Sequence, residues 1–299
     1  MSATAETCLT ERPARSAGTE ALGALFVTLS AFAFSTAGLF TILIDADAST
    51  LLFWRGIFGG SLIGAYVVWR ERRSGLRAFS RIGAAGLIAA ACSTLSTICF
   101  IQALRRTTVT DVAVIYATTP FLAAAIAWLW LKERPAGATL VASLAALAGV
   151  VFMFGASLGQ GQLTGNLLAL AMSLGIAAMM VVIRQNRQVS MLPATCLSAF
   201  ACSLLVSPFA APFSIAGLDW LWVVLFGTTQ FGLGLLFLTI GSRLLSPART
   251  ALISNLELPL GPLWVWLAFG QLASRSTWIG GAIVMVAVIG DFAASRRRR

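Results

Sequence analysis

The chain contains no histidine, and only 11% of its 299 residues are charged, against about 25% in an ordinary soluble domain. Without histidine, the sequence excludes Ser-His-Asp hydrolases, HExxH metalloproteases and His-ligated haem. Its five cysteines show no CxxC spacing, and four of them lie within apolar runs, so they indicate neither a disulfide framework nor a zinc site. We therefore expect no catalytic residue, no metal site and no cofactor.

Hydrophobic residues make up 58% of the chain, above the roughly 45–50% of soluble domains. A soluble protein of this composition would expose large hydrophobic patches to water. As a helix, about 20 apolar residues span the hydrocarbon core of a bilayer. The sequence therefore predicts an all-α integral membrane protein with ten transmembrane helices, at 20–44, 50–69, 81–104, 110–131, 136–156, 163–183, 192–212, 217–241, 248–270 and 276–294.

The glycine- and glutamine-bearing stretch 155–165 divides these spans into two groups of five. Because five is odd, the second group enters the membrane upside down, which is the geometry of an inverted repeat. A shift of 138 positions brings Arg105 onto Arg243, and the fourth and ninth spans each contain a proline, at Pro120 and Pro259. The predicted organisation is a cytoplasmic tail at 1–19, a five-helix repeat at 20–156, an outer linker at 157–162, a second repeat at 163–294 and a basic cytoplasmic tail at 295–299.

The net charge of +10 comes from short basic clusters between apolar runs, and this distribution argues against a nucleic-acid partner. With a cytoplasmic N-terminus, the inner segments would hold 17 of the 21 basic residues and the outer loops three. By the positive-inside rule, both termini are predicted to be cytoplasmic. We expect a multi-pass protein of the bacterial inner membrane, as a monomer or a homodimer in the lipid bilayer.

Glu257 in the ninth span and Arg55 near the start of the second are the clearest intramembrane charges, and such charges are functional by default. Glu257 is either a cavity-lining group that meets an ammonium group or a proton, or a carboxyl packed between helices. Arg55 is close enough to the outer end to reach water. It is either a structural anchor or a contact for a substrate carboxylate.

Pro120 and Pro259 lack an N–H, so the carbonyls of Tyr116 and Asn255 are predicted to lose their helical partners. Freed carbonyls in a membrane need water, a neighbouring helix or a ligand, and paired interrupted helices are typical of transporter sites. A simple packing kink is the alternative. The predicted cavity set, completed by thinly spread polar and aromatic side chains, is Ser35, Thr36, Trp54, Arg55, Ser96, Tyr116, Thr119, Gln230, Asn255 and Glu257.

Three segments resemble the drug/metabolite transporter superfamily, and its EamA-type members in particular. They are Phe53-Trp54-Arg55, the fourth-span ending 128–135 and the ninth-span stretch 255–271 with its glutamate and prolines. Gln271 stands where an acidic residue is expected after Phe-Gly, so the second half departs from the pattern there. The Trp-rich ninth span is most similar to that of the aromatic amino acid exporters called YddG, and this resemblance implies outward amino-acid transport.

The sequence therefore predicts a non-enzymatic exporter of aromatic and other neutral amino acids with broad selectivity. Transport would proceed by alternating access around a central cavity. Multidrug efflux within the same superfamily is the alternative, because a single buried acid among many aromatic residues would suit a lipophilic cation. An intramembrane enzyme would need a nucleophile with a base or a metal cluster, and the sequence supplies neither.

Overall fold

The computed structural model describes residues 17–71, 82–132, 137–157, 162–186, 191–245, 247–271 and 274–297. Within these ranges every regular element is helical and there is no strand, in agreement with the predicted all-α class. Most of the predicted tails, most of the predicted linker and Glu133 of the fourth-span motif lie outside the described residues. The elements are α1 (Ala17–Ser35), α2 (Ala37–Leu43), α3 (Ala48–Glu71), α5 (Gly83–Leu104), α6 (Val109–Tyr116), α7 (Thr119–Leu131), α8 (Gly137–Ser157), α9 (Leu163–Gln185), α10 (Met191–Val206), η2 (Ser207–Phe209), α11 (Asp219–Leu225), η3 (Phe226–Leu233), α12 (Gly234–Leu244), α13 (Pro247–Ser254), α14 (Glu257–Phe269) and α15 (Arg275–Arg297).

Seven helical stretches in the described ranges are long and apolar enough to cross a membrane. They are Gly18–Leu43, Ala48–Arg70, Gly83–Leu104, Val109–Leu131, Leu163–Gln185, Leu192–Phe209 and Asp219–Leu244, and each overlaps a predicted span. The other predicted spans, at 136–156, 248–270 and 276–294, coincide with α8, with α13 and α14 together, and with α15. The chain is a multi-pass membrane protein, and the count of ten spans stays a prediction.

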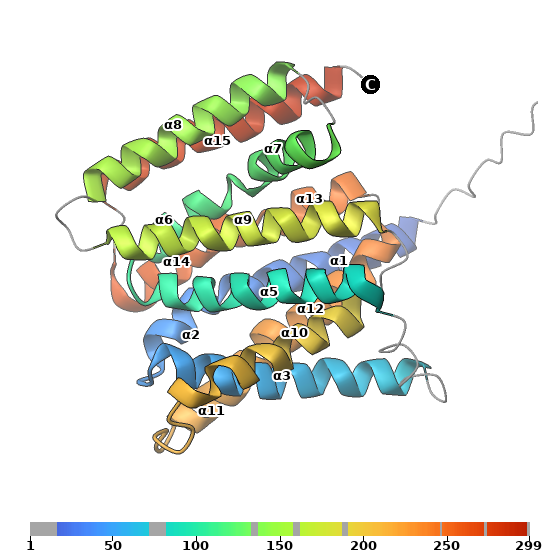
Figure 1. Cartoon of the computed structure of the whole chain (residues 1–299), viewed down its shortest axis with the longest axis vertical. Helices are drawn as coiled ribbons and strands as arrows, with labels where there is room; N and C mark the ends of the chain where they lie inside the picture. The colour runs from blue at the N-terminus through green and yellow to red at the C-terminus, as the bar shows by residue number, and fades with distance from the viewer. Residues whose placement is uncertain are drawn as a thin grey trace, which may run out of the picture.

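Helices from the two halves of the chain interleave. α1 packs against α12, α3 against α10, α5 against α9 and α8 against α15, so each of these pairs joins one half to the other (Figure 1). The pair of α8 and α15 forms a layer at one edge of the bundle (Figure 1). Glycine permits the close approach of α5 and α9, because a Cβ added at Gly175 would lie 2.2 Å from the Ser96 Oγ.

Two broken helices recur at a fixed spacing. α6 and α7 are separated by residues 117–118, and α13 and α14 by residues 255–256. Each end of α13 and α14 lies 138 residues after the matching end of α6 and α7, the same shift that the sequence indicates. α7 and α14 then both end on a left-handed residue, Lys132 (φ 57°) and Gly270 (φ 66°), which are also 138 positions apart.

The two halves differ at two other places. The first helix of the first half breaks at Thr36, between α1 and α2, whereas α9 is continuous over 23 residues. α5 is a regular α-helix, whereas the third helical stretch of the second half contains the eight-residue π-helix η3. These departures lie side by side, since the rings of Phe40 in α2 and Phe226 in η3 are 5.6 Å apart. Because π-helical segments are frequent at functional sites, this region is a first indication of where the site lies.

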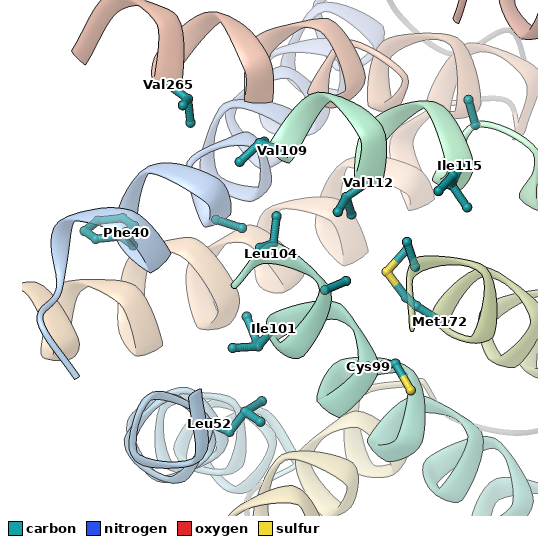
Figure 2. Packing of buried hydrophobic residues seen from close by; sticks show 14 of the residues in the cluster. Phe40, Leu52, Cys99, Ile101, Leu104, Val109, Val112, Ile115, Met172 and Val265 are labelled. Carbon is teal, nitrogen blue, oxygen red and sulfur yellow. The ribbon is translucent and has the colours of Figure 1, made fainter. Parts of the chain in front are cut away.

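The main hydrophobic core closes the end of the bundle where α2 ends and α6 begins. Phe40, Val109, Met172 and Val265 converge there from four different helices (Figure 2). Packing is tight, because a Cβ added at Gly38 of α2 would lie 2.7 Å from both methyl groups of Val109. A smaller apolar cluster joins α3, α10 and α12 toward the opposite end of α3.

Candidate functional site

The two broken helices bring Tyr116 and Glu257 together. Tyr116 is the last residue of α6, Glu257 is the first residue of α14, and these two helices pack against each other. The Tyr116 hydroxyl and the Glu257 carboxyl lie close enough to interact electrostatically. The free N–H groups at the start of a helix favour negative charge, so the first turn of α14 also stabilises a carboxylate at Glu257. The acid therefore lies at a helix start in mid-span and not inside a continuous helix.

The carbonyls that precede the prolines both have donors within the chain. Thr119 Oγ1 donates to the Tyr116 carbonyl at 2.6 Å, and the Leu258 N–H donates to the Asn255 carbonyl at 3.2 Å. The prediction that these carbonyls need water, a neighbouring helix or a ligand is therefore wrong. A threonine hydroxyl replaces the missing helical donor in one helix, and a tighter turn replaces it in the other.

Arg55 of α3 lies in the interior and does not extend to the outer surface. Its side chain is only 6% exposed, so the prediction that it can reach water at the outer end is wrong. Its Nε donates to the Gln230 Oε1 at 3.1 Å, and its guanidinium carbon lies 5.4 Å and 4.3 Å from the ring centres of Phe226 and Phe231. The π-helix η3 supplies all three of these partners. These three contacts hold the Arg55 side chain in the interior.

The α1/α2 joint lies between these two polar pairs. Gln230 Nε2 donates to the Phe34 carbonyl at 3.5 Å, and the Trp264 Nε1 of α14 donates to the Ser35 Oγ at 2.8 Å. The hydroxyl of Thr36 donates to the carbonyl of Ala33 and stays local. Trp264 follows Glu257 by seven residues, which is about 10 Å along a helix. Arg55 and Glu257 thus have different partners on either side of the joint.

Two predicted residues lie apart from this group. Trp54 donates from Nε1 to the Pro212 carbonyl at 3.0 Å and packs against the rings of Phe58 and Trp220. Ser96 is buried against α9, and among the described residues its hydroxyl has no hydrogen-bond partner. A cavity of about 700 Å³ lies between α8 and α15, and none of the candidate residues lines it. The central cavity stays a prediction.

Asp111, in the first turn of α6, is a buried acid that the sequence analysis missed. It is 3% exposed and accepts hydrogen bonds from the Thr277 hydroxyl of α15 at 2.5 Å and from the Thr107 hydroxyl at 3.1 Å. Thr107 also donates to Asn166 of α9 at 2.6 Å. Thr108, three residues before Asp111, caps the helix by accepting from the Asp111 N–H. That Thr-x-x-Asp spacing is the signal that could have placed Asp111 inside a helix start.

The same end of the bundle carries charged groups outside the spans. Asp47 accepts from the N–H groups of Ser49 and Thr50 and from the Thr50 hydroxyl. Partial burial raises the pKa of Asp47, but these hydrogen bonds outweigh it and the net pKa is lowered. Arg105 donates to the carbonyls of Ile44 and Ala46, and partial burial lowers its pKa against the opposing influence of Asp45 and Asp47.

An interleaved helical bundle with polar pairs at its broken helices is the architecture of a membrane transporter. Within the described ranges, no three His, Cys, Asp or Glu side chains are grouped so as to hold a metal ion. The profile of the EamA-like transporter family matches this sequence twice, at residues 21–155 and 163–290. The chain belongs to the EamA-like transporter family, which confirms the predicted resemblance to the drug/metabolite transporter superfamily.

Individual relatives agree with this assignment. The chain is 27% identical over 290 residues to the "Uncharacterized transporter YwfM" of Bacillus subtilis (strain 168), and the match covers 92% of this chain and 95% of that protein. A protein crystal structure with 20% sequence identity superposes with a TM-score of 0.65 over 93% of this chain and 99% of the other. At that identity the structural likeness shows the fold alone. The finer likeness to the aromatic amino acid exporters stays a prediction.

Proposed function

We propose that this transporter exports neutral amino acids, including aromatic ones, with broad selectivity across the bacterial inner membrane. Export would proceed by alternating access between two inverted halves of five transmembrane helices each. Several observations support the repeat. The family profile matches twice in succession, the bounds of α6 and α7 recur at an offset of 138, and α1 begins on the side of the bundle where α15 ends (Figure 1). The distribution of basic residues supports a cytoplasmic location for both termini.

The observation that carries the proposal is the Tyr116–Glu257 pair at the junction of the two broken helices. A carboxyl group at this depth suits a substrate ammonium group or a coupled proton. Asn255, two residues earlier, is exposed although it lies in mid-span, which favours an aqueous opening beside the pair because a bare amide against lipid is costly. The buried Arg55 across the α1/α2 joint favours a substrate that also carries an anionic group.

The remaining predicted cavity residues support a loosely fitting site. The hydroxyls of Ser35, Thr36 and Thr119 and the amide of Gln230 are hydrogen-bonded within the chain, and the surrounding surface is aliphatic and aromatic. Such a surface distinguishes neighbouring side chains poorly, because one methylene in an apolar space is worth about 1–3 kcal/mol. Broad selectivity among neutral amino acids follows from this composition.

Transport by the purified chain in liposomes tests the proposal. Wild-type protein is expected to exchange tryptophan, threonine and methionine across the membrane. Glu257→Gln keeps the shape of the side chain but removes its charge. We expect it to lower tryptophan transport about 10- to 100-fold, since a charge-assisted hydrogen bond is lost.

Comparing two modes of transport assigns the role of Glu257. If the residue carries a coupled proton, the variant loses accumulation driven by a pH gradient but retains downhill exchange. If it contacts the substrate ammonium, affinity falls in both modes. Glu20→Gln, at an exposed ion pair with Arg249, is the matched carboxyl-to-amide control and should transport like the wild type. A wild-type protein that moves ethidium but none of the three amino acids would overturn the proposal in favour of multidrug efflux.

A further inference from the structure

We propose that Arg55, oriented by Gln230, is a carboxylate-binding subsite of this transporter and selects substrates that carry a carboxylate. The inference rests on the proposed function and adds the part of the substrate that is recognised and the residues that recognise it.

Arg55 is only 6% exposed, and within the described residues most of the hydrogen-bonding capacity of its guanidinium is unused. Nε–H donates to Gln230, but within the described structure the four N–H groups on Nη1 and Nη2 have no acceptor. No carboxylate of a described residue lies within ion-pair distance of it. Buried guanidinium groups are ordinarily paired, because burying an uncompensated charge is expensive.

The two aromatic neighbours compensate this charge only in part. Phe226 and Phe231 present ring faces at cation–π distances of 5.4 Å and 4.3 Å. Phenylalanine is a weaker cation–π partner than tryptophan, and a charge-assisted bidentate hydrogen bond is stronger than either contact. Gln230 and the two phenylalanine rings therefore hold the Arg55 guanidinium in place, but its positive charge has no anionic partner. A planar anion is the group that fits its free edge.

Gln230 fixes which edge of the guanidinium remains free. Its Oε1 accepts from Arg55 Nε while its Nε2 donates to the carbonyl of Phe34, so both ends of the amide are used. With Nε occupied, the parallel N–H groups of Nη1 and Nη2 are left for an end-on bidentate pair, the geometry that a carboxylate matches. The π-helix η3 supplies Gln230 and both phenylalanines, so this irregular helix builds the subsite.

The chemistry specifies a class of substrate. One guanidinium with two aromatic walls suits a monocarboxylate on an aliphatic or aromatic body, and it disfavours a lipophilic cation by direct charge repulsion. Three compounds that share one ring system separate these features. Tryptophan has both charged groups, tryptamine lacks the carboxylate, and indole-3-propionate lacks the ammonium group.

The test measures transport of these compounds by full-length protein in liposomes. Arg55→Gln is expected to lower kcat/KM for tryptophan and indole-3-propionate about 100-fold while leaving tryptamine unchanged or improved. Arg55→Lys keeps the positive charge but loses the two parallel N–H groups, and should retain more transport of tryptophan and indole-3-propionate than Arg55→Gln. Equal losses for all three compounds would assign Arg55 to packing and overturn the subsite.

Gln230→Glu provides a second variant that separates a positioning role from a structural one. The new carboxylate would pair with the Nε–H of Arg55 and neutralise its charge, so tryptophan transport should fall about as far as in Arg55→Gln, and the thermal midpoint in detergent reports whether the variant still folds. Undiminished tryptophan transport by a well-folded Gln230→Glu variant would contradict the proposal. Wild-type protein that transports none of the three compounds would instead refute the proposed function itself, so the two failures are distinguishable.

Discussion

The two ends of the helical bundle are held together differently. At the α6 end, where α6 and α15 begin, α6 packs on both α14 and α15, and Thr277 donates to the buried Asp111. At the α13 end, where α1 and α13 begin, the offset of 138 places Arg249 in the position of Asp111. Arg249 forms an exposed ion pair with Glu20 of α1. Among the described residues, α13 has no packing against α7 or α8 comparable to that of α6.

This difference shows that the contacts at the two ends of the bundle are unequal. The α6 end carries the Asp111 hydrogen bonds and the apolar contacts of Phe40, Val109 and Val265. Under the proposed orientation this is the outer end.

The largest effect is expected from removing the Asp111 carboxyl. Asp111→Ala would remove the buried carboxylate that accepts from the Thr277 hydroxyl and one of the two acceptors of the Thr107 hydroxyl, and should lower the free energy of unfolding by about 2–3 kcal/mol. The thermal midpoint in detergent measures this. Arg249→Gln, at the equivalent position, removes an exposed ion pair and should cost below about 1 kcal/mol. Equal losses of unfolding free energy in both variants would contradict the conclusion that the two ends of the bundle are held together differently.

A smaller effect is expected from crowding the tight contact at the α6 end. Gly38→Ala places a Cβ about 2.7 Å from the short, stiff side chain of Val109, so α2 and α6 must separate. We expect a loss of about 1–2 kcal/mol and greater reactivity toward water-soluble thiol reagents of a cysteine introduced at Val112, a buried position of α6 that leaves Val109 in place. Gly18→Ala in α1, which meets no atom within 4 Å, is the control and should be neutral or slightly stabilising. An unreactive cysteine at Val112 would count against the helix separation.

The smallest effect is expected at the start of α3. Asp47→Ala removes an N-cap and should cost about 1 kcal/mol at neutral pH. Because the pKa of Asp47 is lowered in the folded protein, its stabilisation is present above its ordinary pKa and is lost as the pH falls through the lowered value. Wild type and variant should therefore converge in acid. Asp45→Ala, at an exposed neighbouring carboxyl, should change little, and a constant difference between wild type and Asp47→Ala at every pH would contradict the capping role.

The sequence was sufficient for the features that arise from local chemistry. Hydropathy places helices at every predicted span, because the apolar runs match the length of a membrane-crossing helix. Pro120 and Pro259 indicated the broken helices, because proline removes a helical donor wherever it occurs. The sequence predicted Tyr116 and Glu257 for one central cavity, and both residues lie at the breaks of the two interrupted helices.

The features that depend on tertiary structure could not be predicted from the sequence. The inward position of Arg55 depends on η3, and no sequence motif in residues 226–233 predicts a π-helix. Neither Ser96 nor Trp54 joined the central group, because their surroundings are set by Gly175 and Pro212, which lie far away in the sequence. Asp111 lies at the edge of the predicted span 110–131. Only its contact with Thr277, 166 positions later, shows that it is buried between helices.

The interleaving of the two halves has a consequence for how the protein is made. α1, α3, α5 and α8 each find their principal partner in the second half of the chain, so the first half must wait in the membrane for synthesis to continue. At about 5–20 residues per second, that delay is on the order of ten seconds. We therefore expect the first half of the chain, made alone, to lack a stable fold until the second half is supplied.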